Sequence, residues 1–399
     1  MKITVHRPEQ IGGCITEIES DSGTRIVIDV GSNLPGKKIS EEIDVAKLTK
    51  GCDGVFITHY HGDHIGEFDK VDNNTPIYMG SVAHEIFLNL CEFLPGKDVE
   101  AVKIFNTFRP MEKITVGDMI IMPFRVDHSA YDSYMFLIKC EGKKILHTGD
   151  FRTHGWTGKG VEALLKEYVK KIDLLICEGT MLSREGEELL SEQGLCDQAK
   201  EIFRNNRNVF VLCSSTNIDS IASFYKAANA VGRLVVADKY QRLNMDIVSA
   251  SAKSSLYKFP YVKLFWPDRK ECINEMRRRG FCMFVRASRP PGVDKNKFKL
   301  LMDEFPDSLL IYSMWKGYLK KETLDKNIYD FIPKDTQGKL SYTYLHTGGH
   351  ATEEAIISVC DITKPDIIIP IHSENPGRFE ELGLRSTIRR LKSGECLKI

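Results

Sequence analysis

The chain has 399 residues, with 55 Lys and Arg balanced by 55 Asp and Glu. This length predicts two domains, or one large domain with an insertion, because single domains usually hold about 100–200 residues. No apolar run approaches the ~20 residues that a bilayer-spanning helix needs, and the N-terminus shows no basic start followed by an apolar block. We therefore expect neither membrane association nor a secretory signal.

The 11 cysteines are odd in number and form no CxxC pair. This argues against a disulfide framework and against a cysteine-based zinc module, and it is typical of the reducing cytoplasm. Charge is unevenly distributed: residues 186–334 hold 25 Lys and Arg against 18 Asp and Glu, a net of +7 that the rest of the chain balances. The basic segment indicates an anionic ligand, with chance distribution over solvated surfaces as the equal alternative.

The N-terminal part of the chain is predicted to form short β-strands joined by turns. The expected strands are residues 3–6, 14–19, 24–30, 55–58, 77–79, 119–124, 133–139, 144–147 and 174–177. Helices are expected at 81–94 and 161–170.

After residue 179 strands and helices alternate. Helices are expected at 191–205, 217–230, 245–253 and 295–305, with strands at 209–212, 235–237, 281–286 and 309–313. The chain ends with a strand at 342–346, a helix at 352–360 and a strand at 367–371. This alternation predicts a parallel sheet covered by helices on both faces.

The strongest chemical signal directly follows the apolar strand at 55–58. His59, His61, Asp63 and His64 fall within six residues. Histidine is the commonest nitrogen ligand of zinc, and carboxylates complete such sites. In a tight loop, residues two apart can face one centre while the next pair faces another, which suits two metals about 3.5–4 Å apart. A solvated polar loop is the weaker interpretation.

This HxHxDH motif after a short strand resembles the metallo-β-lactamase fold, an αββα sandwich of two sheets with helices outside and metals at one edge. Asp29, in the segment VIDVG, matches the aspartate that orients the site of this fold. His128, in VDHS, matches a later metal-binding histidine, and Asp150, in HTGDF, matches the aspartate that bridges both metals.

The last ligand separates subfamilies, since small hydrolases of this fold supply it soon after the bridging aspartate. Here a long basic segment intervenes before His372, in PIHSE. This resembles the β-CASP nucleases, such as ribonuclease J and the cleavage-and-polyadenylation endonucleases, whose motifs A and B match Glu178 and His350. Histidine at motif C, here His372, is associated with RNA-cleaving members, whereas the DNA cross-link repair branch typically carries valine.

The resemblance implies a metallo-β-lactamase domain at 1–185 and 335–399, interrupted by a β-CASP insertion at 186–334. It also implies two zinc ions per chain, which manganese could replace. The implied metal ligands are His59, His61, Asp63, His64, His128, Asp150 and His372.

The implied activity is zinc-dependent hydrolysis of phosphodiester bonds in single-stranded RNA, by attack of metal-bound hydroxide in a cleft between two domains. Asp63, Glu178 and His350 are the expected catalytic residues. His350 would donate a proton to the leaving oxygen or hydrogen-bond a phosphate oxygen, and Glu178 would fix its tautomer. A capping or surface carboxylate is the alternative for Glu178.

Nucleic-acid contacts are expected from His346 and from Ser215, Thr216 and Asn217, which precede a helix. A packed histidine and a simple helix N-cap made by serine or threonine are the respective alternatives. The loop resembles the ribonuclease J segment that contacts the 5′-phosphate, but Asp219 stands where that enzyme has histidine. A carboxylate repels phosphate, so we expect internal cleavage or a preference for 5′-hydroxyl ends.

Other functions remain open at the level of the sequence. A DNA nuclease would use the same residues, and a small-molecule hydrolase or a non-catalytic nucleic-acid-binding relative would share the fold. The expected partner is RNA, with DNA as the second choice. A dimer is compatible with the resemblance, but the further C-terminal domain of ribonuclease J is not recognised here, so no oligomeric state follows.

Overall fold

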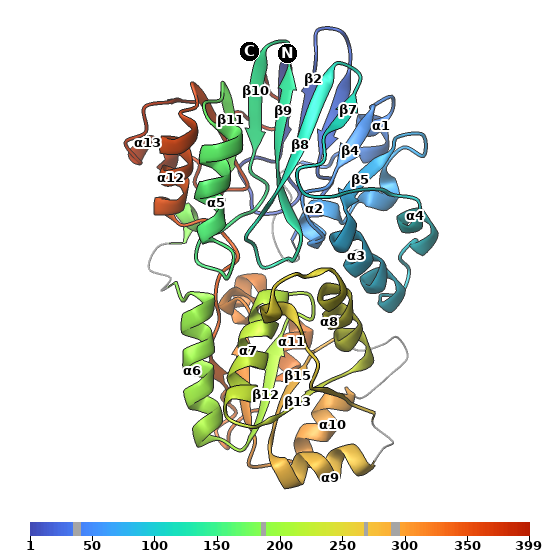
Figure 1. The fold of residues 1–399 in the computed structure, drawn as a ribbon, viewed down its shortest axis with the longest axis vertical. Helices are drawn as coiled ribbons and strands as arrows, with labels where there is room; N and C mark the ends of the chain where they lie inside the picture. Colours follow the sequence, from blue (N-terminus) through green and yellow to red (C-terminus); the bar gives the residue numbers. More distant parts are fainter. Residues whose placement is uncertain (35–40, 185–188, 267–269, 289–295) are drawn as a thin grey trace. The chain divides into compact units, whose positions relative to one another are not determined.

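The computed structural model describes residues 1–34, 41–184, 189–266, 270–288 and 296–399. The chain divides into two compact units, each described separately (Figure 1). Unit 1 comprises Met1–Leu88, Asp98–Glu188 and Gly349–Ile399, and unit 2 comprises Asn89–Lys97 and Leu189–Gly348. The domain limits inferred from the sequence stay a prediction.

The first sheet of unit 1 has the strand order β20-β1-β2-β3-β4-β5-β6. Neighbours are antiparallel from β20 to β3 and parallel from β3 to β6. The strands are β1 (Lys2–His6), β2 (Ile15–Glu19), β3 (Arg25–Ile28), β4 (Gly54–Phe56), β5 (Ile77–Gly80), β6 (Asn106–Phe108) and β20 (Cys396–Lys398).

The second sheet has the order β19-β18-β11-β10-β9-β8-β7. The hairpins from β7 to β10 are antiparallel, and β10, β11, β18 and β19 are parallel. The strands are β7 (Ile114–Val116), β8 (Met119–Val126), β9 (Ser133–Cys140), β10 (Lys143–His147), β11 (Leu174–Glu178), β18 (Ile367–Ile371) and β19 (Thr387–Ile388).

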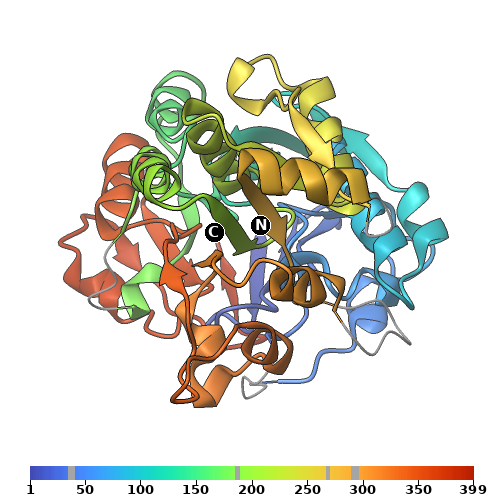
Figure 2. The same cartoon turned by 90° about the horizontal axis from the view of Figure 1, so that it is seen from below.

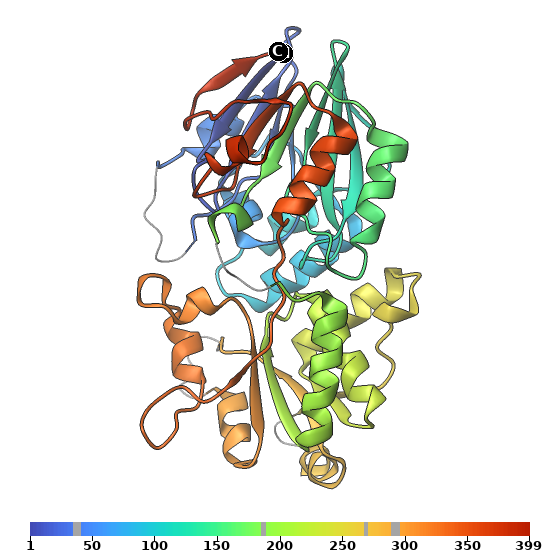
Figure 3. The ribbon, with the colours of Figure 1, turned by 90° about the vertical axis from the view of Figure 1, so that its left-hand side faces the viewer.

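The two sheets of unit 1 pack face to face (Figure 3). Side chains from both, among them Ile3, Phe56, Phe136 and Ile176, form one buried cluster. The outer face of the second sheet is covered by α5 and α12, which contribute Val161 and other apolar residues to a second cluster. The predicted αββα sandwich is therefore confirmed.

The helices of unit 1 include single turns that connect strands as well as longer covering helices. They are α1 (Val45–Thr49), α2 (Gly62–Ile65), α3 (Ser81–Phe93, which continues into unit 2), α4 (Val99–Lys103), α5 (Lys159–Leu164), α12 (Glu353–Thr363) and α13 (Arg378–Glu381). Short non-α turns are η1 (Phe68–Lys70), η2 (Leu165–Val169) and η3 (Met181–Ser183).

Unit 2 contains a parallel sheet with the order β14-β13-β15-β12-β16-β17. Helices surround this sheet (Figure 2). Apolar residues of α9, α10 and α11 pack on one of its faces, and α7 contacts β13 and β15. The strands are β12 (Asn208–Cys213), β13 (Leu234–Ala237), β14 (Val262–Leu264), β15 (Phe281–Val285), β16 (Leu309–Ser313) and β17 (Thr343–Tyr344).

The helices of unit 2 are α6 (Glu192–Asn205), α7 (Ile218–Ala230), α8 (Lys239–Ser251), α9 (Lys270–Arg279), α10 (Lys297–Asp303) and α11 (Lys326–Phe331), with short turns η4 (Ser255–Tyr257), η5 (Lys316–Leu319) and η6 (Lys321–Thr323). Four of these helices, α6, α7, α8 and α10, were predicted from the sequence, whereas α9 and α11 were missed. The predicted start of α8 was wrong by six residues. The helix begins earlier because Asp238 and Gln241 form a capping box at its N-terminus.

Candidate active site

The HxHxDH residues lie in a tight turn directly after β4. The backbone amides of His64 and Ile65 donate to the carbonyl of His61, at 2.9 and 3.0 Å, and these bonds close the single turn α2. The turn separates the motif into two pairs, since His59 and His61 precede it while Asp63 and His64 lie inside it.

His59, His61 and His128 form the first group of potential metal ligands. His61 Nδ1 lies 3.1 Å from His59 Nε2 and 3.2 Å from His128 Nε2. His128 Nδ1 donates to the carbonyl of Gly349 at 2.5 Å, which turns its Nε2 towards the group. Burial, together with the neighbouring imidazoles, lowers the pKa of His59 and His128 well below 6.5. These rings are therefore neutral at pH 7 and carry free lone pairs, as metal ligands must.

Asp63, His64 and His372 form the second group. Asp63 Oδ2 lies 3.4 Å from His372 Nε2 and 4.0 Å from His64 Nε2. Burial alone would raise the pKa of Asp63, but the hydrogen bond from His372 and the charge on His64 hold it below its ordinary value. His372 Nδ1 lies 2.8 Å from the hydroxyl of Thr180, which leaves His372 Nε2 facing the group.

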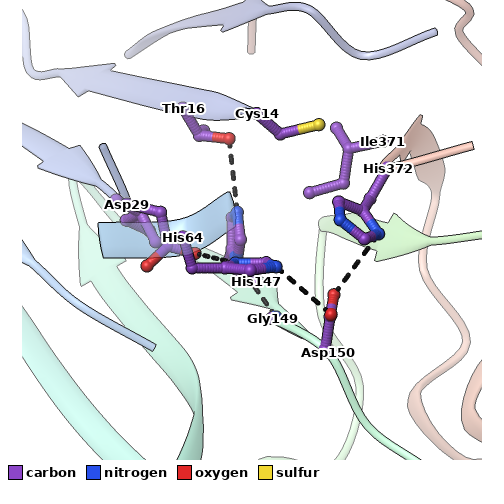
Figure 4. Close-up of a pocket in the computed structure, with 10 residues that line it drawn as sticks. Cys14, Thr16, Asp29, His64, His147, Gly149, Asp150, Ile371 and His372 are labelled. Atoms are coloured by element: carbon purple, nitrogen blue, oxygen red, sulfur yellow. Dashed lines mark hydrogen bonds and ion pairs between the residues drawn. The ribbon is translucent and has the colours of Figure 1, made fainter. Parts of the chain in front are cut away.

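Asp150 lies between the two groups. Its Oδ2 is 3.2 Å from His64 Nε2 and its Oδ1 is 3.6 Å from His372 Nδ1 (Figure 4). Its Oδ2 also lies 4.0 Å from His59 Nε2. Asp150 Oδ1 and His64 Nε2 are buried, and among the described residues they make these ion-pair contacts but no hydrogen bond. Buried polar atoms are usually hydrogen-bonded, so the donor set fits one or two divalent cations shared by Asp150.

Asp29 orients His64 from behind. It follows β3 in the left-handed conformation, with φ of 61°. Its Oδ1 accepts a hydrogen bond from the Thr58 amide at 2.8 Å, and its Oδ2 accepts from the Thr58 hydroxyl, also at 2.8 Å. His64 Nδ1 lies 2.8 Å from Asp29 Oδ2, and a proton on Nδ1 leaves Nε2 as the atom that faces Asp150.

Glu178 and His350 form a pair beside Asp150. Glu178 ends β11 fully buried, and its Oε1 accepts hydrogen bonds from the amides of Phe151 and Ala351. Its Oε2 lies 3.0 Å from His350 Nδ1, which is also 3.5 Å from Asp150 Oδ2. Burial lowers the pKa of His350, but the carboxylates of Glu178 and Asp150 outweigh it and raise the pKa above 6.5.

A small cavity behind these residues is lined by Cys14, Thr16 and His147 on its far side (Figure 4). His147 Nδ1 accepts a hydrogen bond from the Gly149 amide at 3.1 Å, so its proton is on Nε2, which donates to the Thr16 hydroxyl at 3.2 Å. Burial lowers the pKa of His147 to about 4. His147 therefore joins the two sheets as a neutral residue.

The predicted nucleic-acid contacts from Ser215 to Asn217 lie in unit 2, after β12. Asn217 caps α7, since its side chain accepts from the Ser220 amide at 3.2 Å. The cap is thus the asparagine and not a serine or threonine. Ser215 is 7% exposed, and among the described residues its hydroxyl has no hydrogen-bond partner, as expected of a group that meets a ligand.

Asp219 lies in the first turn of α7 and is buried. Its Oδ1 accepts a hydrogen bond from the Tyr257 hydroxyl at 2.6 Å. His346 follows β17 and its ring lies 6.2 Å from that of Tyr344. The contact roles of His346, Ser215, Thr216 and Asn217 stay predictions.

The predicted metal ligands all belong to unit 1 and converge there, together with Asp29, Glu178 and His350. The predicted nucleic-acid contacts belong to unit 2. The sequence interpretation missed Thr58 and Thr180, which orient Asp29 and His372. The signal available for both was their position: Thr58 precedes the HxHxDH motif, and Thr180 lies two residues after Glu178.

Residues 24–205 match the family model described as "Beta-lactamase superfamily domain". The resemblance to the metallo-β-lactamase fold that was recognised from the motifs is therefore confirmed over these residues. A solved protein of unknown function from Enterococcus faecalis V583 shares the fold with a TM-score of 0.73, at 19% identity and 99% coverage of both chains.

The chain is similar to Ribonuclease J of Helicobacter pylori (strain B128), at 23% identity over 92% of this chain and 54% of the relative. It is also similar to Ribonuclease J of Thermus thermophilus, at 25% identity over 80% of this chain and 57% of the relative. The chain also matches the DNA cross-link repair protein SNM1 of Arabidopsis thaliana, at 20% identity over 88% of this chain and 67% of the relative. The chain thus spans about half the length of the first two relatives.

Proposed function

We propose that this chain is a metal-dependent nuclease that cleaves RNA, using two divalent cations, zinc or manganese. The observation that carries the proposal is the sharing of Asp150 between two groups of ligands beside the Glu178–His350 pair. Cations bound there would act as Lewis acids that lower the pKa of water and offset charge developing on a phosphate.

The residues of the chain would then divide the remaining work. His350, protonated by virtue of its raised pKa, would donate a proton to the leaving oxygen or a hydrogen bond to a phosphate oxygen. Glu178 would hold His350 in position through Nδ1 and leave Nε2 for the substrate. Asp29 would fix the tautomer of His64.

RNA is favoured by His372 and by the similarity to proteins named Ribonuclease J. The second candidate is DNA, which the match to the DNA cross-link repair protein supports. A small-molecule hydrolase would have no use for the basic segment 186–334. We place the protein in the cytoplasm, because its cysteines are unpaired.

Cleavage of labelled single-stranded RNA, single-stranded DNA and duplex DNA tests the proposal. We expect RNA to be cleaved fastest and the nearly isosteric Asp150→Asn variant to be inactive on all three, because it lacks the shared carboxylate charge. Faster cleavage of DNA would establish the second candidate. No cleavage of any polymer by metal-loaded protein would contradict both. Metal analysis should find two ions per chain, and fewer than one would count against the proposal.

A circular RNA tests where cleavage begins. The buried carboxylate of Asp219, in the first turn after Ser215–Asn217, should disfavour the extra charge of a 5′-monophosphate. We therefore expect the circle to be cut, and linear RNAs with 5′-monophosphate and 5′-hydroxyl ends to be degraded at similar rates. Survival of the circle alongside rapid loss of the monophosphorylated strand would contradict this inference.

A further inference from the structure

The turn that carries Asp63 and His64 is held from outside by two loops. The amide of Gly13 donates to the carbonyl of Asp63 at 3.0 Å, and the amide of Val30 donates to the carbonyl of His64 at 2.8 Å. A third bond joins the Ser32 amide to the Gly62 carbonyl at 3.0 Å. Three successive carbonyls of the turn are thus fixed by residues 13 and 30–32.

The loops lie so close to the turn that Gly12 and Gly31 leave no room for a side chain. A Cβ placed on Gly31 would overlap the carbonyl oxygen of Asp63, and one on Gly12 would lie 3.1 Å from Asp63 Cβ. Gly12 also has φ of +89°, which disfavours any other residue. Because the loops and the turn are in direct contact, a shift of either loop must move Asp63.

Arg7 joins the two loops to each other. Its Nη1 donates to the carbonyl of Gly13 at 3.3 Å and to that of Gly31 at 3.5 Å, while its Nε donates to the carbonyl of Glu41 at 2.9 Å. The side chain is 4% exposed, and among the described residues no carboxylate lies within ion-pair distance, although the charge of Glu67 acts on it from further away. Burial lowers the pKa of Arg7, because its direct partners are neutral carbonyls. A leucine or methionine would be expected here if packing alone mattered.

We propose that Arg7 is a positioning residue for the second group of metal ligands, Asp63, His64 and His372. The role rests on the proposed metal centre. Arg7 acts by locking residues 13 and 31 against each other, so that the turn holds Asp63 and His64 at the distance that a cation requires. The first group, His59, His61 and His128, makes no bond to these loops among the described residues and should not depend on Arg7.

The test is titration of metal-free protein with zinc against a chromophoric chelator. We expect two ions in the parental protein. In Arg7→Met we expect one ion to bind with parental affinity and the other about 10-fold or more weaker, the usual effect of losing an outer support of a metal ligand. Arg7→Lys should be intermediate, because an ammonium keeps the charge but not the planar fork that reaches two carbonyls.

Arg25→Met is the matched control. Arg25 also belongs to unit 1 and donates to two backbone carbonyls, those of Leu48 at 2.9 Å and Lys50 at 2.7 Å, but it touches neither ligand group. It should lose stability without any change in zinc binding, which separates positioning from a general structural role.

Parental binding of both ions by folded Arg7→Met overturns the role of Arg7 and leaves the proposed function intact. If circular dichroism shows that Arg7→Met does not fold, Arg7→Gln replaces it, and parental binding of both ions by that variant overturns the role equally. A parental protein that binds fewer than one ion would contradict the proposed function and this role together.

Discussion

His350 is the residue whose protonation state matters most for the proposed chemistry. Its Nδ1 lies between two carboxylates, 3.0 Å from Glu178 and 3.5 Å from Asp150. The hydrogen bond to Glu178 leaves the other ring nitrogen for a substrate oxygen. A histidine that was merely packed in the core would have no need of two buried carboxylates.

The first prediction concerns the removal of this imidazole. His350→Ala should lower kcat on RNA by roughly 10²–10⁴, the usual contribution of a positioned acid or base. Metal content should stay at the parental level, because the ligands of both groups remain. Single-turnover cleavage and metal analysis of the same preparation provide the measurement, and a parental rate would exclude a catalytic role for His350.

The second prediction concerns pH. Because the pKa of His350 is raised above 6.5, its ring keeps the charge to higher pH than a free imidazole does. The charge is lost only as pH rises through this higher pKa. A step that needs protonated His350 should therefore slow on the alkaline side. Glu178→Gln removes the carboxylate that raises this pKa, so the alkaline limb of the kcat profile should move to lower pH.

The control for the pH profile of Glu178→Gln is His350→Ala, whose kcat profile should have no alkaline limb. An alkaline limb that stays in place in Glu178→Gln would show that another group titrates there.

At the scale of secondary-structure elements, several of the site residues lie at or just after the ends of strands. Asp29 follows β3, and Asp150 and His372 follow β10 and β18 of the parallel part of the second sheet. The carboxyl ends of parallel strands meet at one edge, which brings residues far apart in sequence together. Asp29 and His372 adopt φ of 61° and 51°, strained values that surrounding structure must maintain.

The third prediction tests the loop between β8 and β9, which contacts α3. Asp132 Oδ2 accepts hydrogen bonds from the amides of Val82 and Ala83 at 3.0 and 3.1 Å, and Asp132 Oδ1 accepts from the Tyr134 hydroxyl at 2.7 Å. Asp132→Ala removes the helix cap and leaves a buried hydroxyl without its acceptor. We expect the free energy of unfolding to fall by about 1–3 kcal/mol, measured from urea unfolding followed by circular dichroism.

Asp132→Asn is the matched control, because asparagine keeps an acceptor oxygen and tolerates the φ of 67° at this position. It should retain most of the stability. Equal midpoints for Asp132→Ala and the parental protein would contradict the capping role.

At the scale of the whole molecule, the cysteines report on burial throughout the chain. Ten are buried without a disulfide, and Cys396 is exposed. Burial raises the pKa of Cys14, Cys213 and Cys360 to about 12, so these thiols stay protonated and unreactive at neutral pH.

The fourth prediction is that a thiol reagent at pH 8 modifies one group rapidly in the native protein and 11 after denaturation. Cys396→Ser should abolish the rapid phase, with Cys52→Ser as the control that leaves it unchanged. Two or more rapid thiols in the native protein would mean that a buried cysteine becomes accessible.

None of the described helices is long and apolar enough to cross a membrane.

Much of this protein could be predicted from the sequence alone. The order of most strands and helices follows from short apolar runs and turns, and the parallel sheet of unit 2 follows from their alternation. The sandwich of unit 1 was expected from the family resemblance that the motifs carry. The residue types of the candidate metal site were also predictable, because the spacing of imidazoles and carboxylates from His59 to His64 is typical of such sites.

The ends of helices and strands were less predictable where hydrogen bonds of polar side chains determine them. The N-terminus of α8 depends on the capping box of Asp238 and Gln241, and the strand expected at 342–346 pairs only over Thr343–Tyr344. Such endpoints depend on hydrogen bonds that the hydrophobic pattern does not contain.

Only the tertiary structure decided how the site is supported. The contacts of Thr58 with Asp29, of Thr180 with His372 and of the Gly12 and Gly31 loops with Asp63 join segments up to 192 residues apart. The hydrogen bond from Arg7 to the carbonyl of Gly31 also joins two separate segments of the chain. No periodicity records such contacts, because they arise when separate strand ends meet at one edge of the two packed sheets and their buried polar groups must find partners there.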